Sequence, residues 1–371
     1  MSKKRARPID SFFVNASNPT IKRPRSSIGP GIEEDGDEGI LKKDITNNAP
    51  KTYSSHPTYP FPIAALPPAL AHELNTATTA NTGRPIVTDG PDGDLDLVYF
   101  EPFIRRRAAR QLFEFLRAEL PFYRVEYDIV RRGTSSHVRT PRWTTVFGLD
   151  DTSCFSSSSS TAVVGVTSDG RYRASPRPLP RCLEDLRLAV ERALIANADG
   201  DGDGDGGEEG RGEKGSSKFF NFCLVNYYAS GADSIAFHSD DERFLGARPT
   251  IASLSLGATR DFLMKRKPPP PAAAASTTTP MTAATSTTKP LKLPLAGGDM
   301  VVMRGATQAN WLHSVPKRGG RNESDGGRIN ITFRRARVKA GTENYYNYNV
   351  GTGPVYRWDA ADQEMKQWKS L

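Results

Sequence analysis

The fold is decided by residues 219–267, FFNFCLVNYYASGADSIAFHSDDERFLGARPTIASLSLGATRDFLMKRK, in which short apolar, β-branched and aromatic runs alternate with Gly, Pro and Asp turns. Two further runs of the same kind, LPLAGGDMVVM and RINITFR, follow over residues 293–303 and 328–334. Short strands that succeed one another without helices between them are typical of an antiparallel sandwich or jelly roll. The second half of the chain is therefore predicted to be a β-structure of this class.

Two helices are predicted ahead of this block. Over 103–120, apolar residues recur at helical spacing while arginines occupy the opposite face. A second helix is expected from about Leu183, where Leu186, Val190 and Leu194 form the apolar stripe. Helices followed by a run of strands make the predicted fold class α+β.

Composition excludes several classes of protein. The 371 residues carry 50 Lys and Arg against 42 Asp and Glu, a net charge of +8 that is compatible with a nucleic-acid partner without identifying one. No apolar run is long enough for a membrane helix, and the N-terminus lacks the apolar core of a secretory signal. Three cysteines without a CxxC pair argue against a disulfide scaffold or zinc ribbon, so the cytosol or nucleus is expected.

The chain is predicted to have three parts. Residues 1–93 are rich in Pro, Ser, Thr, Asn and Gly and are expected to be a mostly disordered tail, in which one short helix could form around Ala69–Leu74. Residues 94–338 form the globular domain, and residues 339–371 are too aromatic for a disordered tail, so this extension is expected to pack on the domain. Three segments with linker composition interrupt the domain, at about 154–161, 197–217 and 266–290.

The N-terminal tail carries two short motifs. The basic residues Lys3, Lys4, Arg5 and Arg7 are typical of a nuclear-import patch, which predicts a nuclear location. The residues Ile9, Phe12 and Phe13 resemble the peptide that docks on the sliding clamp PCNA, although Ala6 stands where the usual leading Gln would be. The alternative is a disordered tail with an incidental aromatic pair.

A metal site is predicted from His238-Ser239-Asp240. Residues two apart on a strand point to the same side, so the imidazole and the carboxylate could bind one ion. His313 is the only histidine downstream that could be a third ligand, and two His with one carboxylate is the ligand set of non-haem iron(II) oxygenases. The alternatives are a surface His beside a solvated acidic cluster, and a half-buried structural His at position 313.

A site for a dicarboxylate is predicted from the strand 328–334. Arg328 and Arg334 lie on the same face, six residues apart, and guanidinium groups pair bidentately with carboxylates. The alternative is an amphipathic strand with one solvated face. Asn226 and Tyr228 form a second polar pair in an apolar strand, and a bound acid would satisfy them.

Taken in order, Asn-x-Tyr at 226–228, His-x-Asp at 238–240, His313 and Arg-x-Asn-x-Thr-x-Arg at 328–334 resemble the AlkB family of iron(II)- and 2-oxoglutarate-dependent dioxygenases. The Asp-Asp-Glu run at 240–242 is similar to the eukaryotic DNA-repair branch. The resemblance extends from about Leu95 to Arg337. It implies a double-stranded β-helix (jelly-roll) core with flanking helices and a nucleotide-recognition lid.

The resemblance also implies roles for individual residues. The iron(II) ligands, and so the catalytic centre, would be His238, Asp240 and His313. The 2-oxoglutarate site would comprise Asn226, Tyr228, Arg328, Asn330, Thr332 and Arg334. The substrate would be bound by Asp241, Glu242, a stacking Tyr172 and a lid arginine, Arg142.

The function that the resemblance implies is oxidative demethylation of alkylated DNA by a monomeric enzyme. O₂ and 2-oxoglutarate would be co-substrates, and 1-methyladenine and 3-methylcytosine would lose their methyl groups as formaldehyde after the base is flipped from the duplex. Two alternatives stay open: the same chemistry on methylated RNA or protein, and a non-catalytic nucleic-acid or clamp-binding adaptor.

Overall fold

The computed structural model describes residues 52–77, 82–87, 94–131, 133–149, 177–198, 219–268, 289–319, 327–337 and 353–369. All of them belong to one compact unit, Thr52–Leu371. The basic patch, the clamp-like motif and Tyr172 lie outside the described residues, as do most of the three predicted insertions. The predicted insertion at 266–290 begins too early, because Arg266 is still the last residue of a strand.

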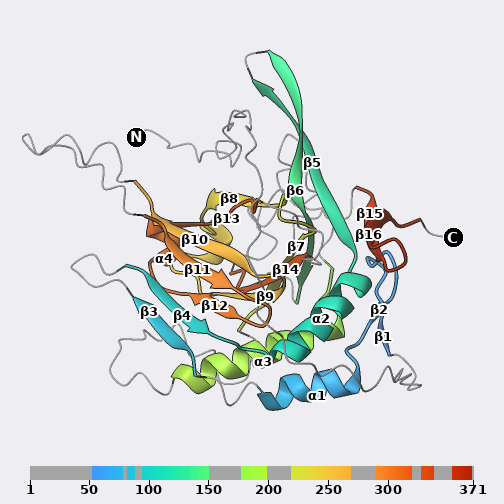
Figure 1. The fold of residues 1–371 in the computed structure, drawn as a ribbon, viewed down its shortest axis with the longest axis horizontal. Coiled ribbons are helices and arrows are strands. Elements are labelled where there is room, and N and C mark those ends of the chain that lie inside the picture. Colours follow the sequence, from blue (N-terminus) through green and yellow to red (C-terminus); the bar gives the residue numbers. More distant parts are fainter. Residues whose placement is uncertain are drawn as a thin grey trace, which may run out of the picture. The chain divides into compact units, whose positions relative to one another are not determined.

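Two antiparallel sheets form the body of this unit (Figure 1). The large sheet has the order β16 (Glu364–Gln367), β15 (Val355–Asp359), β5 (Phe122–Arg131), β6 (Thr134–Gly148), β7 (Phe222–Tyr228), β14 (Arg328–Arg334), β9 (Ile251–Gly257), β12 (Met300–Met303), β4 (Asp96–Phe100) and β3 (Arg84–Val87). The small sheet has the order β11 (Leu291–Leu295), β10 (Arg260–Arg266), β13 (Trp311–Val315) and β8 (Ile235–His238). One buried cluster, which includes Leu224 of the large sheet and Met264 of the small one, joins the two. This arrangement confirms the predicted jelly-roll core.

Helices cover the other face of the large sheet. They are α1 (Pro68–Ala77), α2 (Arg106–Glu119) and α3 (Arg181–Ala198), with a further short pair, β1 (Tyr53–Ser54) and β2 (Ile63–Ala64). The predicted helices over 103–120 and from Leu183 are therefore confirmed as α2 and α3, which bury their apolar stripes against the sheet. Each helix of the described residues is too short or too polar to cross a bilayer.

Strand β14 separates the helix-covered core from the space between the sheets. Ile329, Ile331 and Phe333 pack with the helices in one cluster. Because side chains alternate along a strand, the polar residues between them face the small sheet. All seven residues of β14 are buried, so the alternation seen in the sequence marks two buried faces, one apolar and one polar. The alternative of an amphipathic strand with a solvated face is thus wrong, and the polar face is an interior one.

The predicted disordered tail over 1–93 is wrong for its second half. Helix α1 buries Leu70 and Leu74 in the main core, and β3 pairs with β4 at the edge of the large sheet. Local composition indicated disorder because these segments are rich in Pro and polar residues. Their order comes from tertiary partners, which local composition does not reveal.

Strands β5 and β6 form a long hairpin that projects from the rest of the large sheet (Figure 1). The turn passes through Gly133, whose positive φ of 80° suits glycine. Arg142 lies on β6, near the base of the hairpin and beside the polar face of the sheet.

The C-terminal residues 353–369 pack on this sheet. Strand β15 pairs with β5, and the ring of Tyr356 lies 4.5 Å from that of Trp143 in an edge-to-face contact. The guanidinium of Arg117 lies 3.8 Å over the ring of Trp358. The aromatic residues noted in the sequence therefore fasten a terminal hairpin to α2 and β5.

Trp358→Ala is expected to destabilise the protein by about 2–3 kcal/mol, less than the ~3–5 kcal/mol typical of a fully buried aromatic residue. The loss comes from the Arg117 contact and from packing against the ring of Tyr227 at 6.3 Å. Urea unfolding measures it, with the exposed Gln367→Ala on β16 as the matched control. Equal unfolding midpoints for the two variants would contradict the assigned packing.

Candidate active site

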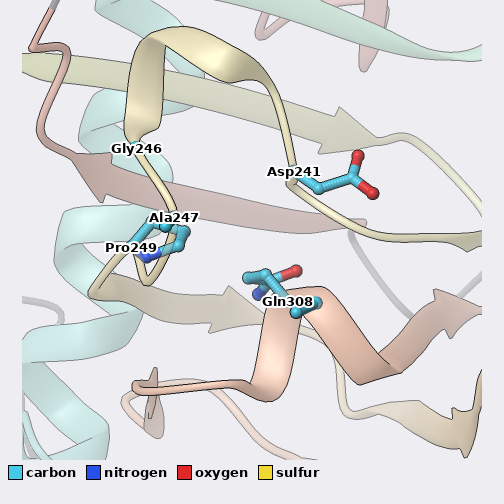
Figure 2. Close-up of a pocket in the computed structure, with 6 residues that line it drawn as sticks. Asp241, Gly246, Ala247, Pro249 and Gln308 are labelled. Atoms are coloured by element: carbon cyan, nitrogen blue, oxygen red, sulfur yellow. The ribbon is translucent and has the colours of Figure 1, made fainter. Parts of the chain in front are cut away.

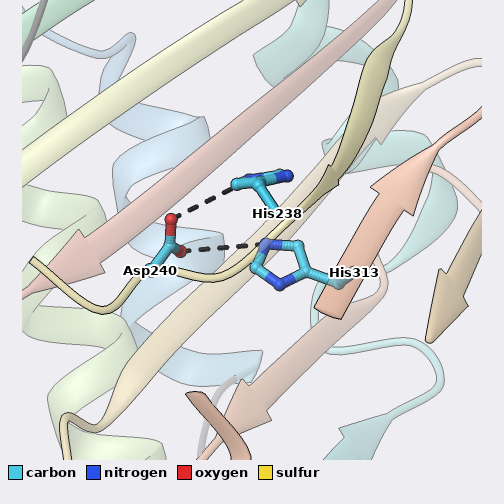
Figure 3. A group of neighbouring side chains, drawn as sticks. All are labelled: His238, Asp240 and His313. Carbon is cyan, nitrogen blue, oxygen red and sulfur yellow. Dashed lines mark ion pairs between the residues drawn. The ribbon is translucent and has the colours of Figure 1, made fainter. Parts of the chain in front are cut away.

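Three potential metal ligands meet at one edge of the small sheet. His238 ends β8, and His313 lies directly opposite it on β13, with ring centroids 4.2 Å apart. The Asp240 carboxylate oxygens lie 3.9 Å from Nε2 of each histidine. Their donor atoms all fall within 4.8 Å of one another (Figure 3). This is the donor set of two His and one carboxylate on one side of an ion, which leaves other coordination positions open.

The protonation states of these side chains suit a metal. Burial lowers the pKa of His238 and lowers that of His313 to about 3, so both imidazoles are neutral. Burial by itself would raise the pKa of Asp240, but the charge of Arg334 and its hydrogen bond hold the pKa below its ordinary value. The Nδ1 of His238 donates a hydrogen bond of 2.8 Å to the Ala236 carbonyl. The other ring nitrogen, Nε2, therefore faces Asp240. Neutral imidazole and ionised carboxylate are the forms that bind metals.

Arg334 bridges two acidic side chains beside this group. Its Nη2 lies 3.0 Å from Asp240 Oδ1, and its Nη1 lies 3.4 Å from Glu242 Oε1. Glu242 is largely enclosed, and burial raises its pKa to about 7 although Arg334 opposes the shift. The Asp240 carboxylate is therefore held from one side by an arginine, while its Oδ2 has no hydrogen-bond partner among the described residues.

The strand register brings the sequence motifs to one polar face. On β14 and β7, Arg328 is opposite Tyr228 and Asn330 is opposite Asn226. Residues opposite each other in antiparallel strands project to the same side, so the two motifs share a face. The donors of Asn330 are directed at Ser253 and the Leu254 carbonyl, at 2.9 and 3.1 Å.

Thr332 likewise donates to a backbone carbonyl, that of Leu224, at 3.1 Å. Asn330 and Thr332 thus tie neighbouring strands together in this structure.

Arg328 is the buried cation of this face. Only 1% of the residue is exposed, and its Nη2 donates to Ser255 Oγ at 2.9 Å. Its Nε and Nη1 are buried and have no partner in the part of the chain that the structure describes. Burial lowers the pKa of Arg328 to about 10, so it stays charged at neutral pH. A buried guanidinium with two unused donors is complementary to a carboxylate.

Arg142 reaches the same face from the hairpin. Its Nε donates to Asn226 Oδ1 at 3.2 Å, and Thr144 Oγ1 donates to the same oxygen at 3.1 Å. The Nη1 of Arg142 is buried and has no partner among the residues described. The charge of Arg142 is close enough to contribute to the lowered pKa of His238.

The two acidic residues after the triad are separated. Asp241 is exposed, accepts a 2.8 Å hydrogen bond from Ser239 and lies 3.0 Å from Lys267 Nζ. It stands at the rim of a cavity of about 360 Å³ (Figure 2) whose lining comprises Asp241, Gly246, Ala247, Pro249, Gln308 and Ala309. Glu242 instead turns toward Arg334. The sequence had grouped these two carboxylates together.

For two residues at the site, the sequence predicted no role beside the metal. Gln308 belongs to the short helix α4 (Thr307–Asn310), and Lys267 follows the end of β10. Both contact the segment that carries Asp240 and Asp241. Gln and Lys are common surface residues, and no motif in the sequence distinguishes these two.

Comparison with known proteins agrees with this geometry. The model of the 2OG-Fe(II) oxygenase superfamily matches residues 96–334. The mouse alpha-ketoglutarate-dependent dioxygenase alkB homolog 3 is 44% identical over 122 residues, which are 33% of this chain and 38% of that protein. The DNA oxidative demethylase ALKBH2 of Arabidopsis thaliana is 41% identical over 120 residues, 31% of this chain and 37% of the relative. The chain thus spans well under half the length of both relatives.

Among solved structures, that of OsALKBH1 covers 67% of this chain and 100% of its own, with 17% identity and a TM-score of 0.37. The family match covers most of the chain, and both relatives are AlkB homologues, which confirms the resemblance found in the sequence. The chain belongs to the 2OG-Fe(II) oxygenase superfamily, whose members use Fe(II) as cofactor with 2-oxoglutarate and O₂ as co-substrates, and its matched segment is similar to AlkB homologues.

Proposed function

We propose that this protein is an oxidative demethylase of DNA that acts on 1-methyladenine and 3-methylcytosine. One observation carries the proposal: the three metal donors and the buried Arg328, with its two unused donors, lie in the interior between the same two sheets. The name of the Arabidopsis relative, DNA oxidative demethylase, supports DNA as the substrate.

In this proposal His238, Asp240 and His313 hold Fe(II). The bound iron, with 2-oxoglutarate and O₂, supplies hydroxylation of the N-methyl group, after which the product releases formaldehyde and an intact base. The protein orients the reactants and shields them from water. The neutral imidazoles and the ionised Asp240 are ready to coordinate without first losing protons.

Arg328 would bind the carboxylate of 2-oxoglutarate that lies farther from the metal. Its Nε and Nη1 are buried donors without a partner among the described residues, and a guanidinium gives charge-assisted hydrogen bonds to carboxylate oxygens. Tyr228, whose ring lies 5.4 Å from this guanidinium, and Asn226 would line the same ligand. Arg334 would act at the metal end, where it already contacts Asp240.

The carboxylates beside the metal would read the damaged base. Methylation at N1 of adenine or N3 of cytosine makes the base cationic and weakens its pairing, which lowers the cost of flipping it out. Asp241 and Glu242 would favour that cation over a neutral base. Arg142 on the lid hairpin and Tyr172 are the proposed contacts on the opposite side of the base.

The proposal is tested with oligonucleotides that carry one 1-methyladenine or 3-methylcytosine, as single-stranded DNA, duplex DNA and RNA. Incubation with Fe(II), 2-oxoglutarate and O₂ is expected to restore the base in DNA, with one formaldehyde and one succinate for each methyl group. Omission of 2-oxoglutarate is the control and should abolish repair.

Each other outcome contradicts the proposal in a different way. Faster repair of RNA would make methylated RNA the substrate. Succinate release without base repair would indicate another substrate, such as a protein. Absence of turnover by a chain that has bound Fe(II) would favour the non-catalytic adaptor.

A further inference from the structure

We propose that Gln308 and Lys267 are positioning residues that set the metal affinity of the site through Asp240. The inference rests on the proposed role of His238, Asp240 and His313 as the iron ligands. Neither residue contributes an atom to the group of metal donors. Both act on the backbone and side chains of the segment that follows β8.

Asp240 lies where strand pairing no longer holds the backbone. β8 ends at His238 and is the edge strand of the small sheet, so the segment after it leaves the ladder. The Asp240 N–H instead donates to Gln308 Oε1 at 2.8 Å. The side-chain amide therefore replaces the missing ladder hydrogen bond at the ligand itself.

Gln308 is itself held firmly. Only 1% of the residue is exposed, and its Nε2 lies 3.1 Å from the sulfur of Met303, at the end of β12. Contacts on both ends of the amide fix which end is oxygen and where it points. A buried amide held in this way can orient a ligand, because it does not exchange with water.

Lys267 ties this arrangement to β10. Its Nζ donates to the backbone carbonyl of Gln308 at 2.8 Å and to Asp241 Oδ2 at 3.0 Å. Its backbone N–H donates to the Asn310 carbonyl at 2.7 Å. One side chain thus joins α4 to the residue after Asp240, so the ligand is restrained on both sides.

Residues that orient metal ligands in this way influence affinity. Loss of such an outer partner costs about 10–100-fold in metal binding or activity. Gln308→Leu removes the acceptor and leaves the Asp240 N–H buried without a partner. Lys267→Met removes Nζ and both of its hydrogen bonds but keeps an unbranched apolar side chain, and Lys267→Arg restores a cation.

The test is an anaerobic titration of the metal-free full chain with Co(II), followed by visible absorption, and then with Fe(II). Gln308→Leu is expected to bind both metal ions about 10–100-fold more weakly than the parent chain. Lys267→Met should bind them more weakly by a smaller factor, and Lys267→Arg should recover part of that loss. The Co(II) spectrum should change in both weakened variants, while the melting temperature of metal-free Lys267→Met stays that of the parent. Lys292→Met, which breaks the 2.8 Å pair with Asp261 on the same sheet, is the matched control and should change neither reading.

Two results would overturn the inference, and they differ from failure of the proposed function. Parent-like affinity and spectra in both Gln308→Leu and Lys267→Met would show that these residues do not position Asp240. An equal loss in Lys292→Met would make the effect a general one of sheet stability. If Gln308→Leu does not fold, Lys267→Met decides alone, because its side chain is a quarter exposed. The proposed iron site itself fails only if the parent chain binds no metal.

Discussion

The His238→Ala chain is expected to lose tight Fe(II) binding and all measurable turnover, while its melting temperature stays close to that of the parent. The substitution deletes one of three donors that lie within 4.8 Å of one another. The loss should exceed the ~10–100-fold that follows removal of an outer partner. Folding is little affected because the side chain is 23% exposed and lies on an edge strand. Anaerobic Fe(II) titration and succinate formation measure the two effects.

His137→Ala is the matched control for this experiment. His137 is an exposed histidine of the β5–β6 hairpin, where Glu126 and Asp128 are its ion-pair partners. The His137→Ala chain should bind Fe(II) with the affinity of the parent. Parent-like Fe(II) affinity in His238→Ala would show that the metal binds elsewhere.

The sequence was most informative where charged or polar residues alternate with apolar residues, at the period of two that a strand requires. In β14, alternation predicted a strand with Arg328 and Arg334 on one side, and the register of β7 places Asn226 and Tyr228 on that same side. Motifs on β14 and β7 can be read locally because the strand itself brings their side chains to one face. His238 and Asp240 also meet, as their spacing predicted, but Asp240 lies beyond the end of β8, so the strand does not place it.

Contacts between distant segments could not be predicted in this way. Gln308 meets Asp240 across 68 positions of the chain, and neither the residue type nor its neighbours indicate that partner. Asp241 and Glu242 are adjacent and chemically alike, yet one is exposed and the other meets Arg334. Before residue 94, the short helix around Ala69–Leu74 was anticipated and is present as α1, whereas the pairing of β3 with β4 and the core position of Leu70 were missed for the same reason.

Arg328→Met is expected to weaken binding of 2-oxoglutarate by roughly 10²-fold or more without destabilising the free protein. The buried guanidinium has two donors unused among the described residues, and burial lowers its pKa to about 10, below the ordinary value. A cation whose pKa is lower in the folded state destabilises the fold fully at every pH below that value, and the cost declines as pH rises from the folded pKa to the ordinary one. Removing the charge should therefore leave the melting temperature at pH 7.5 unchanged or higher.

Loss of the Arg328 cation should strongly lower the affinity for 2-oxoglutarate. Truncating one member of a buried, hydrogen-bonded charge pair costs about 2–5 kcal/mol, so affinity should fall by roughly 10²-fold or more. A ligand at 100 times its Kd stabilises the parent by about 2.7 kcal/mol, and this gain should shrink below ~0.5 kcal/mol in the variant. Thermal unfolding with Mn(II) in place of iron, with and without 2-oxoglutarate, measures both effects.

Arg187→Met separates this signature from a general effect of deleting a buried arginine. The Arg187 side chain is also 1% exposed, but Glu184 and Glu191 pair with it at 2.6 and 2.7 Å. Its removal leaves two carboxylates without their cation, so the melting temperature should fall while the stabilisation by 2-oxoglutarate persists. Arg328→Met should show the reverse pattern, with an unchanged or higher melting temperature and little stabilisation by 2-oxoglutarate. The unused donors of Arg328 bind a ligand, whereas the donors of Arg187 are already paired within the fold. A fall in melting temperature with undiminished 2-oxoglutarate stabilisation in Arg328→Met would assign that arginine to the fold as well.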